Sequence, residues 1–152
     1  IFAENGSIEI GKSSYLKIRI NDFKSTMTFG PDSKLVLKFK KKKKVQLPYK
    51  LVKGVVRWTS EGNKKSIGGI KTPNAAMGVR GTDFITIVNP LLNESEIVCF
   101  DGEVKFLNLK STSDSKIISK NQWGGLGGRF GKNIGDVLTL PAHVISYFKT
   151  LI

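Results

Sequence analysis

The chain has 152 residues, 39% of them hydrophobic and 24% charged, which is typical of a globular domain and excludes a wholly disordered chain. One cysteine excludes an internal disulfide, and a single histidine beside it argues against a structural zinc site. The net charge is +13, and residues 1–60 hold most of the excess, which favours polyanionic partners such as nucleic acid, anionic lipid or acidic wall polymers.

The first two thirds of the chain consist of short segments with the period of two that is typical of half-buried strands. In residues 15–20, for example, Leu16, Ile18 and Ile20 fall on one face and basic residues on the other. Gly54 interrupts a later segment and is expected to form a bulge. Strands are predicted at 15–20, 35–40, 51–58, 84–88, 97–100 and 103–106.

A run of lysines follows the second of these strands. Two interpretations of the run remain open. It can be a solvated strand edge, where lysine prevents strand-to-strand aggregation, or a contact site for phosphates or other anions. The candidate anion-contact residues are Lys40, Lys41, Lys42, Lys43 and Lys44.

The region around residue 100 carries turn chemistry and no convincing catalytic group. Asp101-Gly102 separates two apolar runs and predicts a β-hairpin, because both positions tolerate positive φ. Cys99 is expected to be a buried, inert thiol, since the single histidine is distant in sequence. Acidic pairs such as Glu94 and Glu96 lie near turns, where solvated carboxylates are more common than acid–base pairs. The sequence therefore predicts no enzyme, no cofactor and no metal.

The C-terminal part has a different composition. The segment from Gly124 to Gly131 is dense in glycine and matches neither phosphate-binding fingerprint, so we expect residues 124–140 to form a flexible connector. A helix is predicted over 141–152, with proline in its first turn and His143 at its surface. Its apolar stripe is expected to pack against another element, through Val144, Tyr147, Phe148 and Leu151.

One stretch is difficult to explain as a generic strand and turn. Thr72-Pro73 predicts an extended entry, and Gly78 and Gly81 permit close backbone approach on both sides of Arg80. The Arg80 guanidinium is expected to be partly buried and to need acceptors, either backbone carbonyls or a carboxylate such as that of Asp83.

This stretch closely resembles the signature of FecR domains. The core of the resemblance is Gly78, Val79, Arg80, Gly81, Thr82, Asp83 and Phe84. A lead-in at 72–75, an upstream segment from Leu51 to Arg57 and a downstream segment with Val98, Gly102 and Val104 are similar to the family in the same order. The resemblance covers roughly residues 5–125.

The resemblance implies an all-β, jelly-roll-like sandwich in the envelope or periplasm of a Gram-negative bacterium. FecR itself is a membrane-spanning regulator that receives a signal from an outer-membrane transporter and controls a sigma factor. This sequence has no apolar run of the roughly 20 residues that a membrane-spanning helix needs. It begins with Ile1, so we expect a signal peptide to have been removed.

These observations predict a FecR-like β-sandwich domain at 1–123, a connector at 124–140 and a short C-terminal helix at 141–152. The predicted function is a non-enzymatic periplasmic interaction or sensing domain, whose partner is an envelope protein or an anionic envelope polymer. The alternative is a basic module that binds peptidoglycan, lipopolysaccharide or, less favoured, nucleic acid through its lysines. The signature residues can serve either as a structural turn or as an interaction site.

Overall fold

In the computed structural model the described residues are 5–21, 24–38, 49–61 and 67–152, without the side chains of Ile67 and Arg80. The predicted anion-contact residues Lys40, Lys41, Lys42, Lys43 and Lys44 lie outside the described residues.

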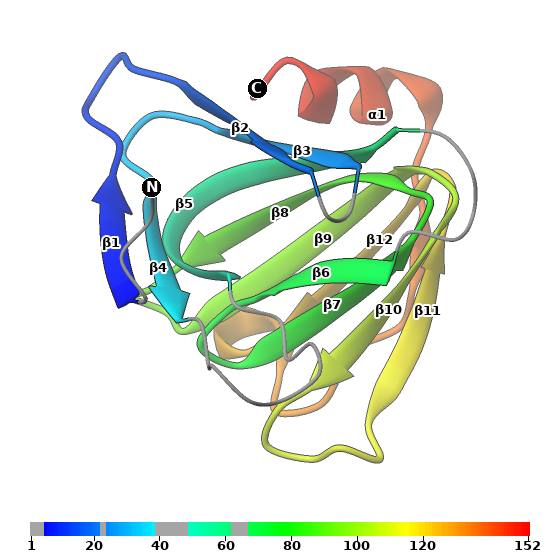
Figure 1. Ribbon diagram of the computed structural model, residues 1–152. Coiled ribbons are helices and arrows are strands. Elements are labelled where there is room, and N and C mark those ends of the chain that lie inside the picture. Colours follow the sequence, from blue (N-terminus) through cyan, green and yellow to red (C-terminus); the bar gives the residue numbers. More distant parts are fainter. Residues whose placement is uncertain (1–4, 22–23, 39–48, 62–66) are drawn as a thin grey trace.

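Strands dominate the described part of the chain and form a curled sheet with two layers (Figure 1). The first layer contains, in hydrogen-bonded order, β1 (Asn5–Glu9), β4 (Lys34–Lys38), β5 (Tyr49–Ser60), β6 (Ile67–Lys71), β7 (Ala75–Arg80), β10 (Glu103–Asn108) and β11 (Ser115–Ser119). The second contains β2 (Leu16–Ile20), β3 (Ser25–Phe29), β5 again, β8 (Asp83–Asn89), β9 (Glu94–Asp101), β12 (Gln122–Leu126) and β13 (Leu138–Thr139). The predicted all-β class is confirmed, while the jelly-roll connectivity stays a prediction.

The long strand β5 belongs to both layers. Its first half pairs with β4, and its second half pairs with β3 and β8. Gly54 lies between the two halves with a φ of +93°, and a β-carbon built there would stand 2.3 Å from Ser33 Oγ. Ser33 Oγ accepts a hydrogen bond from Val55 N at 3.0 Å and donates one to Val55 O at 3.1 Å. The expected irregularity at Gly54 is therefore the point where β5 passes from one layer to the other.

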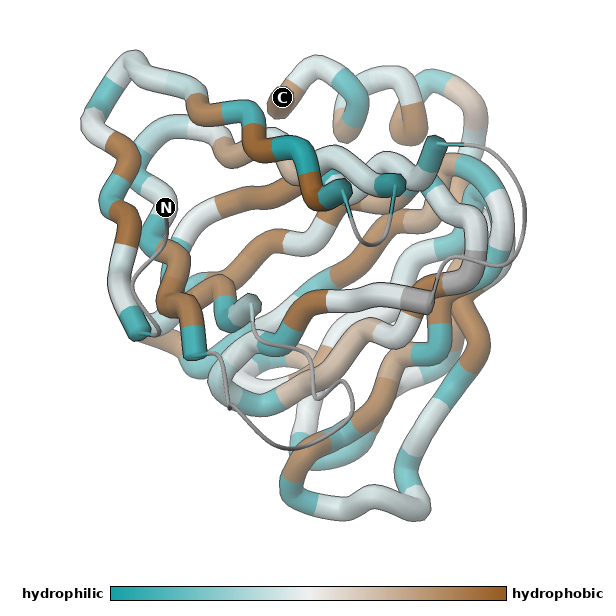
Figure 2. The backbone as a smooth tube through the Cα atoms, viewed as in Figure 1, coloured by the Kyte–Doolittle hydropathy of each residue, from teal (hydrophilic) through white to brown (hydrophobic). Residues whose placement is uncertain are grey.

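The main hydrophobic core lies between the two layers. Alternation along each strand places one set of side chains inward, as the hydropathy colouring of β2 illustrates (Figure 2). The largest fully buried side chains come from both layers and include Met27, Phe29, Leu35, Leu51, Trp58, Ile70, Met77, Phe84, Ile97, Phe106 and Ile118. Burial of this apolar surface is the dominant stabilising contribution to the fold.

The hairpin predicted at Asp101-Gly102 is wrong. Gly102 does adopt a positive φ, of +76°, but β9 pairs with β8 and β12, whereas β10 pairs with β7 and β11. The two strands that flank the turn thus lie in different layers. The turn residues allow a sharp change of direction. Here the chain uses them to pass from the second layer to the first, and the two flanking strands do not pair as a hairpin.

The flexible conformation expected for the glycine-rich segment is also wrong, although the division of the chain into three parts stays a prediction. Gly124 and Gly125 lie within β12 and pair with β9, and the 3₁₀ helix η1 (Gly128–Phe130) follows. A β-carbon on Gly124 would stand 2.8 Å from Ile118 Cδ1, and one on Gly125 would stand 2.8 Å from Phe130 Cγ. A side chain at either position would have to displace these neighbours.

The C-terminal helix α1 (Ala142–Lys149) packs on the outer face of the second layer, where it contacts β9. Figure 1 shows it at the top of the molecule, next to the C-terminus. Its buried residue is Ile145, which contacts a second apolar cluster containing Ile85, Val98 and Phe100. Of the predicted stripe, Tyr147 is 61% exposed. The predicted helix is present, over Ala142–Lys149 in place of 141–152. Phe148 and Leu151 of the predicted stripe pack against the second cluster, while the buried residue of the helix, Ile145, lies outside that stripe.

Candidate functional site

The signature residues form a second corner between the layers. Gly78, Val79 and the backbone of Arg80 end β7 in the first layer, while Asp83 and Phe84 begin β8 in the second. Gly81, with a φ of +62°, and Thr82 connect them. The expected turn around Arg80 is therefore present in the backbone, and its side chain lies outside what the structure describes.

The two corners lie against each other. A β-carbon built on Gly102 would stand 2.6 Å from the carbonyl oxygen of Gly81 and 2.8 Å from Thr82 Cγ2. Thr82 is 3% exposed, and its carbonyl accepts a hydrogen bond from Ser60 N at 2.9 Å. Within the described residues, the Thr82 hydroxyl has no hydrogen-bond partner. The signature turn is thus packed tightly against the other corner and against the end of β5.

Asp83 forms an ion pair with a residue from the upstream segment. Arg57 Nε and Nη2 donate hydrogen bonds to the two carboxylate oxygens of Asp83 at 2.9 and 2.7 Å. The Arg57 guanidinium also lies 5.1 Å from the ring centre of Phe100. The hydrogen bonds to Asp83 raise the pKa of Arg57, and burial opposes that shift. This pair links β5 to the start of β8, two segments that the resemblance identified separately.

Two residues that could serve in catalysis, Cys99 and His143, lie apart, one in the core and one at the surface. Cys99 is buried, its thiol lies 3.3 Å from the carbonyl oxygen of Asp101, and burial raises its pKa to about 12. The burial of this thiol, expected from the sequence, is confirmed. His143 lies on the exposed side of α1, as predicted. In the described ranges, no group of three or more His, Cys, Asp and Glu side chains is arranged to hold a metal ion.

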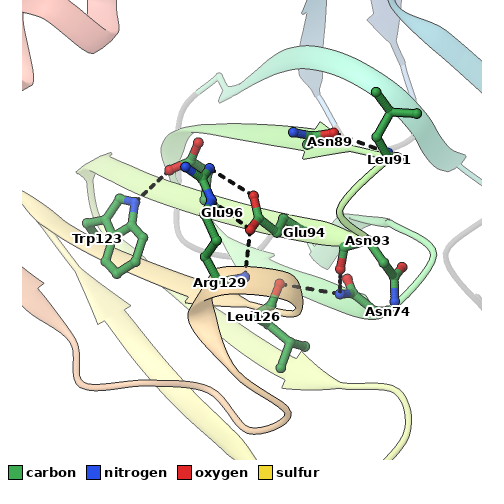
Figure 3. Close-up of polar contacts among 9 residues, drawn as sticks. All are labelled: Asn74, Asn89, Leu91, Asn93, Glu94, Glu96, Trp123, Leu126 and Arg129. Atoms are coloured by element: carbon green, nitrogen blue, oxygen red, sulfur yellow. Dashed lines mark hydrogen bonds and ion pairs between the residues drawn. The ribbon is translucent and has the colours of Figure 1, made fainter.

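The lead-in to β7 forms a buried polar network. Ser95 Oγ donates to Asn74 Oδ1 at 2.5 Å and lies 2.7 Å from Thr72 Oγ1, which in turn accepts a hydrogen bond from Ala75 N at 2.9 Å. Asn74 Nδ2 donates to the carbonyl oxygen of Asn93 at 2.8 Å (Figure 3). This network fixes the lead-in to the end of the β8–β9 turn.

A second ion pair holds the glycine-rich segment against β9. The side chain of Glu94 is 4% exposed, and its carboxylate accepts hydrogen bonds from Arg129 Nε at 2.9 Å, from Arg129 Nη2 at 3.0 Å and from the Arg129 backbone N at 2.7 Å (Figure 3). These bonds lower the pKa of Glu94 and raise that of Arg129. Nearby, Trp123 Nε1 donates to Glu96 at 2.9 Å.

The turns at this end of the sandwich border an open pocket of about 440 Å³. Its lining comes from the lead-in to β7, the β8–β9 turn, the end of β10 and the segment around η1. Sequence reasoning missed it, because the residues that line it are up to 59 positions apart, from Asn74 to Asn133. The one signal available was the glycine-rich segment, which was interpreted as a connector.

Comparison with known proteins identifies one family. The FecR protein family matches residues 6–105. Two crystal structures, each described as a "putative anti-sigma factor" from Parabacteroides distasonis ATCC 8503, are similar in fold. One has a TM-score of 0.74 at 11% identity, and the other has 0.71 at 10% identity. Each similarity covers 95% of this chain but 64% of the other protein. No curated protein matches the sequence. None of the described helices is long and apolar enough to span a membrane.

Proposed function

The chain belongs to the FecR family, and on that premise we propose that it is a non-enzymatic interaction or sensing domain of the bacterial envelope. The match of the family over residues 6–105 carries the proposal. The two proteins of similar fold are each described as a "putative anti-sigma factor", which supports a regulatory role. Periplasmic residence and a protein partner are parts of the same proposal.

We propose that the signature residues mainly build the corner. Their backbone crosses between layers, and Gly81 and Thr82 pack against Gly102. Recognition of a partner then belongs to more exposed parts of the sandwich. The unreactive surroundings of Cys99, whose pKa is about 12, also favour binding over nucleophilic chemistry.

The net charge supports a second candidate function, a polyanion-binding module that uses Lys40, Lys41, Lys42, Lys43 and Lys44. In the described part of the first layer, two further lysines lie side by side, because Lys50 on β5 is the register partner of Lys71 on β6. Peptidoglycan and lipopolysaccharide would be its ligands. Such binding depends steeply on salt, since each anionic contact releases counterions, whereas recognition through apolar contacts does not.

The two candidates can be separated by capture of partners from a Gram-negative envelope extract at low and high salt. The wild-type protein is compared with a variant whose five consecutive lysines are serine. A control variant carries the same change at five exposed lysines elsewhere, which are Lys12, Lys17, Lys53, Lys105 and Lys120.

A protein partner that both variants retain at high salt is the result expected for the interaction domain. The polyanion module is favoured if a ligand is lost at high salt and is also lost when the lysine run is changed, but is retained by the control variant. Loss in both variants alike would indicate non-specific charge. Absence of any retained partner would contradict the interaction domain.

A further inference from the structure

The pocket near η1 has the features of a ligand site that is separate from the signature corner. It has a volume of about 440 Å³, which lies in the range of small-molecule sites. Two kinds of asparagine line it. Asn74 and Asn108 are buried, with 4% and 2% exposure, whereas Asn93 and Asn133 are exposed.

Asn108 positions both lysines of the pocket. Its Nδ2 donates to the carbonyl oxygen of Lys132 at 3.0 Å, and its Oδ1 accepts a hydrogen bond from Lys110 N at 2.9 Å. Its Nδ2 also donates to Asp114 at 2.9 Å. A single buried amide therefore fixes the backbone of two cationic residues that come from different turns.

Asn74, which lies beside Asn108 because its carbonyl accepts a hydrogen bond from Leu109 N at 2.9 Å, fixes a second part of the lining. Its Nδ2 donates to the carbonyl oxygens of Asn93 and Leu126 at 2.8 and 3.3 Å. Gly127 has a φ of +88°, and a β-carbon there would stand 2.0 Å from the Asn93 carbonyl oxygen. The backbone that carries Asn93 is thus fixed before any ligand arrives, which reduces the entropy cost of binding.

Four polar side chains of the lining have no partner of their own. Among the described residues, the ammonium groups of Lys110 and Lys132 form no ion pair, and the side-chain amides of Asn93 and Asn133 form no hydrogen bond. Of the nearby carboxylates, Glu94 pairs with Arg129, and one oxygen of Asp114 accepts hydrogen bonds from Asn108 and from Ile134 N. The pocket therefore offers two cations and two free amides.

We infer that this pocket binds an acidic saccharide. An amide can donate and accept at the same time, which suits neighbouring sugar hydroxyls, and lysine is a point-charge partner for a carboxylate or phosphate on the sugar. A nucleotide fits less well, because none of the described lining residues is aromatic and could stack on a base. The inference does not rest on the proposed signalling role.

The test measures binding by calorimetry to trigalacturonate, to its methyl ester and to mannose 6-phosphate. The first and third probes distinguish carboxylate from phosphate, and the ester removes the charge while keeping the sugar. The variant Lys110→Gln/Lys132→Gln removes the two cations. The control Lys17→Gln/Lys105→Gln removes two exposed lysines outside the pocket. Amide chemical-shift changes in the labelled protein locate the bound probe.

We expect at least one acidic sugar to bind and to shift the amides around Asn93 and Lys132. Binding should weaken about tenfold for the ester and for the pocket variant, and less than about twofold for the control. Absence of binding to both acidic sugars, equal binding of the ester, an equal loss in the control variant or shifts confined to other surfaces would each overturn the inference.

Discussion

Gly102 lies directly against Gly81, because a β-carbon on Gly102 would stand 2.6 Å from the Gly81 carbonyl oxygen. Each residue is in a corner that passes between the two layers, and the corners are 21 residues apart in sequence. Both adopt positive φ, where a side chain is strained. The contact explains why the signature and the downstream glycine occur together in one structural unit.

The first prediction tests this contact between corners. Gly102→Ala should lower the free energy of unfolding by about 1–3 kcal/mol, because the methyl group meets backbone atoms and the residue has positive φ. Gly78→Ala is the matched control, since a β-carbon on Gly78 has no atom within 4 Å, and it should change stability by less than about 0.5 kcal/mol. Urea denaturation measures both. Equal effects of the two substitutions would show that the corners do not need to touch.

A double-mutant cycle tests the ion pair between Arg57 and Asp83. With Arg57→Met and Asp83→Asn as the single changes, the coupling free energy should be about 1–2 kcal/mol, because the pair makes two hydrogen bonds and is mostly shielded from water. The exposed pair Arg19–Glu61 is the control cycle, and its coupling should stay below about 0.5 kcal/mol. Similar couplings in the two cycles would argue against a special role for Asp83.

The pH dependence of stability tests the pair between Glu94 and Arg129. Hydrogen bonds from Arg129 lower the pKa of Glu94 below its ordinary value of 4.5. The unfolded chain therefore binds more protons than the folded chain below that pH, and this stabilising contribution disappears as the pH falls through the folded pKa. Between pH 5 and about pH 3, the free energy of unfolding of the wild type should decrease more steeply with falling pH than that of Glu94→Gln. Urea denaturation at each pH measures it. An identical slope would contradict the lowered pKa of Glu94. The control is Glu103→Gln, which removes an exposed carboxylate.

The helix α1 provides a fourth prediction. Ile145→Ala should reduce stability by about 2 kcal/mol, because Ile145 is buried against Phe100 and its neighbours in the second cluster. Tyr147→Ala on the same helix should have little effect, since that side chain is 61% exposed. Thermal and urea denaturation measure both variants. A larger effect at Tyr147 would favour the stripe expected from the sequence over the observed packing.

Alternation in the sequence was sufficient to predict β2, β4, β5, β8, β9 and β10, because a half-buried strand must place side chains of one kind on one face. Strands such as β3, β6 and β12 were not predicted, since they are short and rich in serine, threonine or glycine. Leu16 and Ile18 on β2, and the interruption at Gly54 on β5, are as predicted. Pairing between strands could not be predicted in the same way. Asp101-Gly102 allows the same backbone conformation in a hairpin and in a corner, and the choice depends on partners far away in sequence.

The candidate site was predicted only in part, because its contacts also join residues that are distant in sequence. The signature identified residues 78–84, but it contained no indication that Asp83 would bind Arg57. Glu94 and Arg129 are 35 residues apart, and a glycine-rich segment gives no periodic signal. Glycine is ambiguous in sequence, since it suits a flexible linker as well as a tightly packed strand. At Gly124 and Gly125 the neighbouring side chains determine the outcome.

The passage of β5 through both layers has a consequence for how the domain folds and melts. Because its two halves pair with different sheets, neither sheet can lose its β5 segment without disturbing the other. We therefore expect a single cooperative unfolding transition with coincident spectroscopic and calorimetric midpoints. Folding should be slow, in the range of milliseconds to seconds, because most pairings join distant parts of the chain.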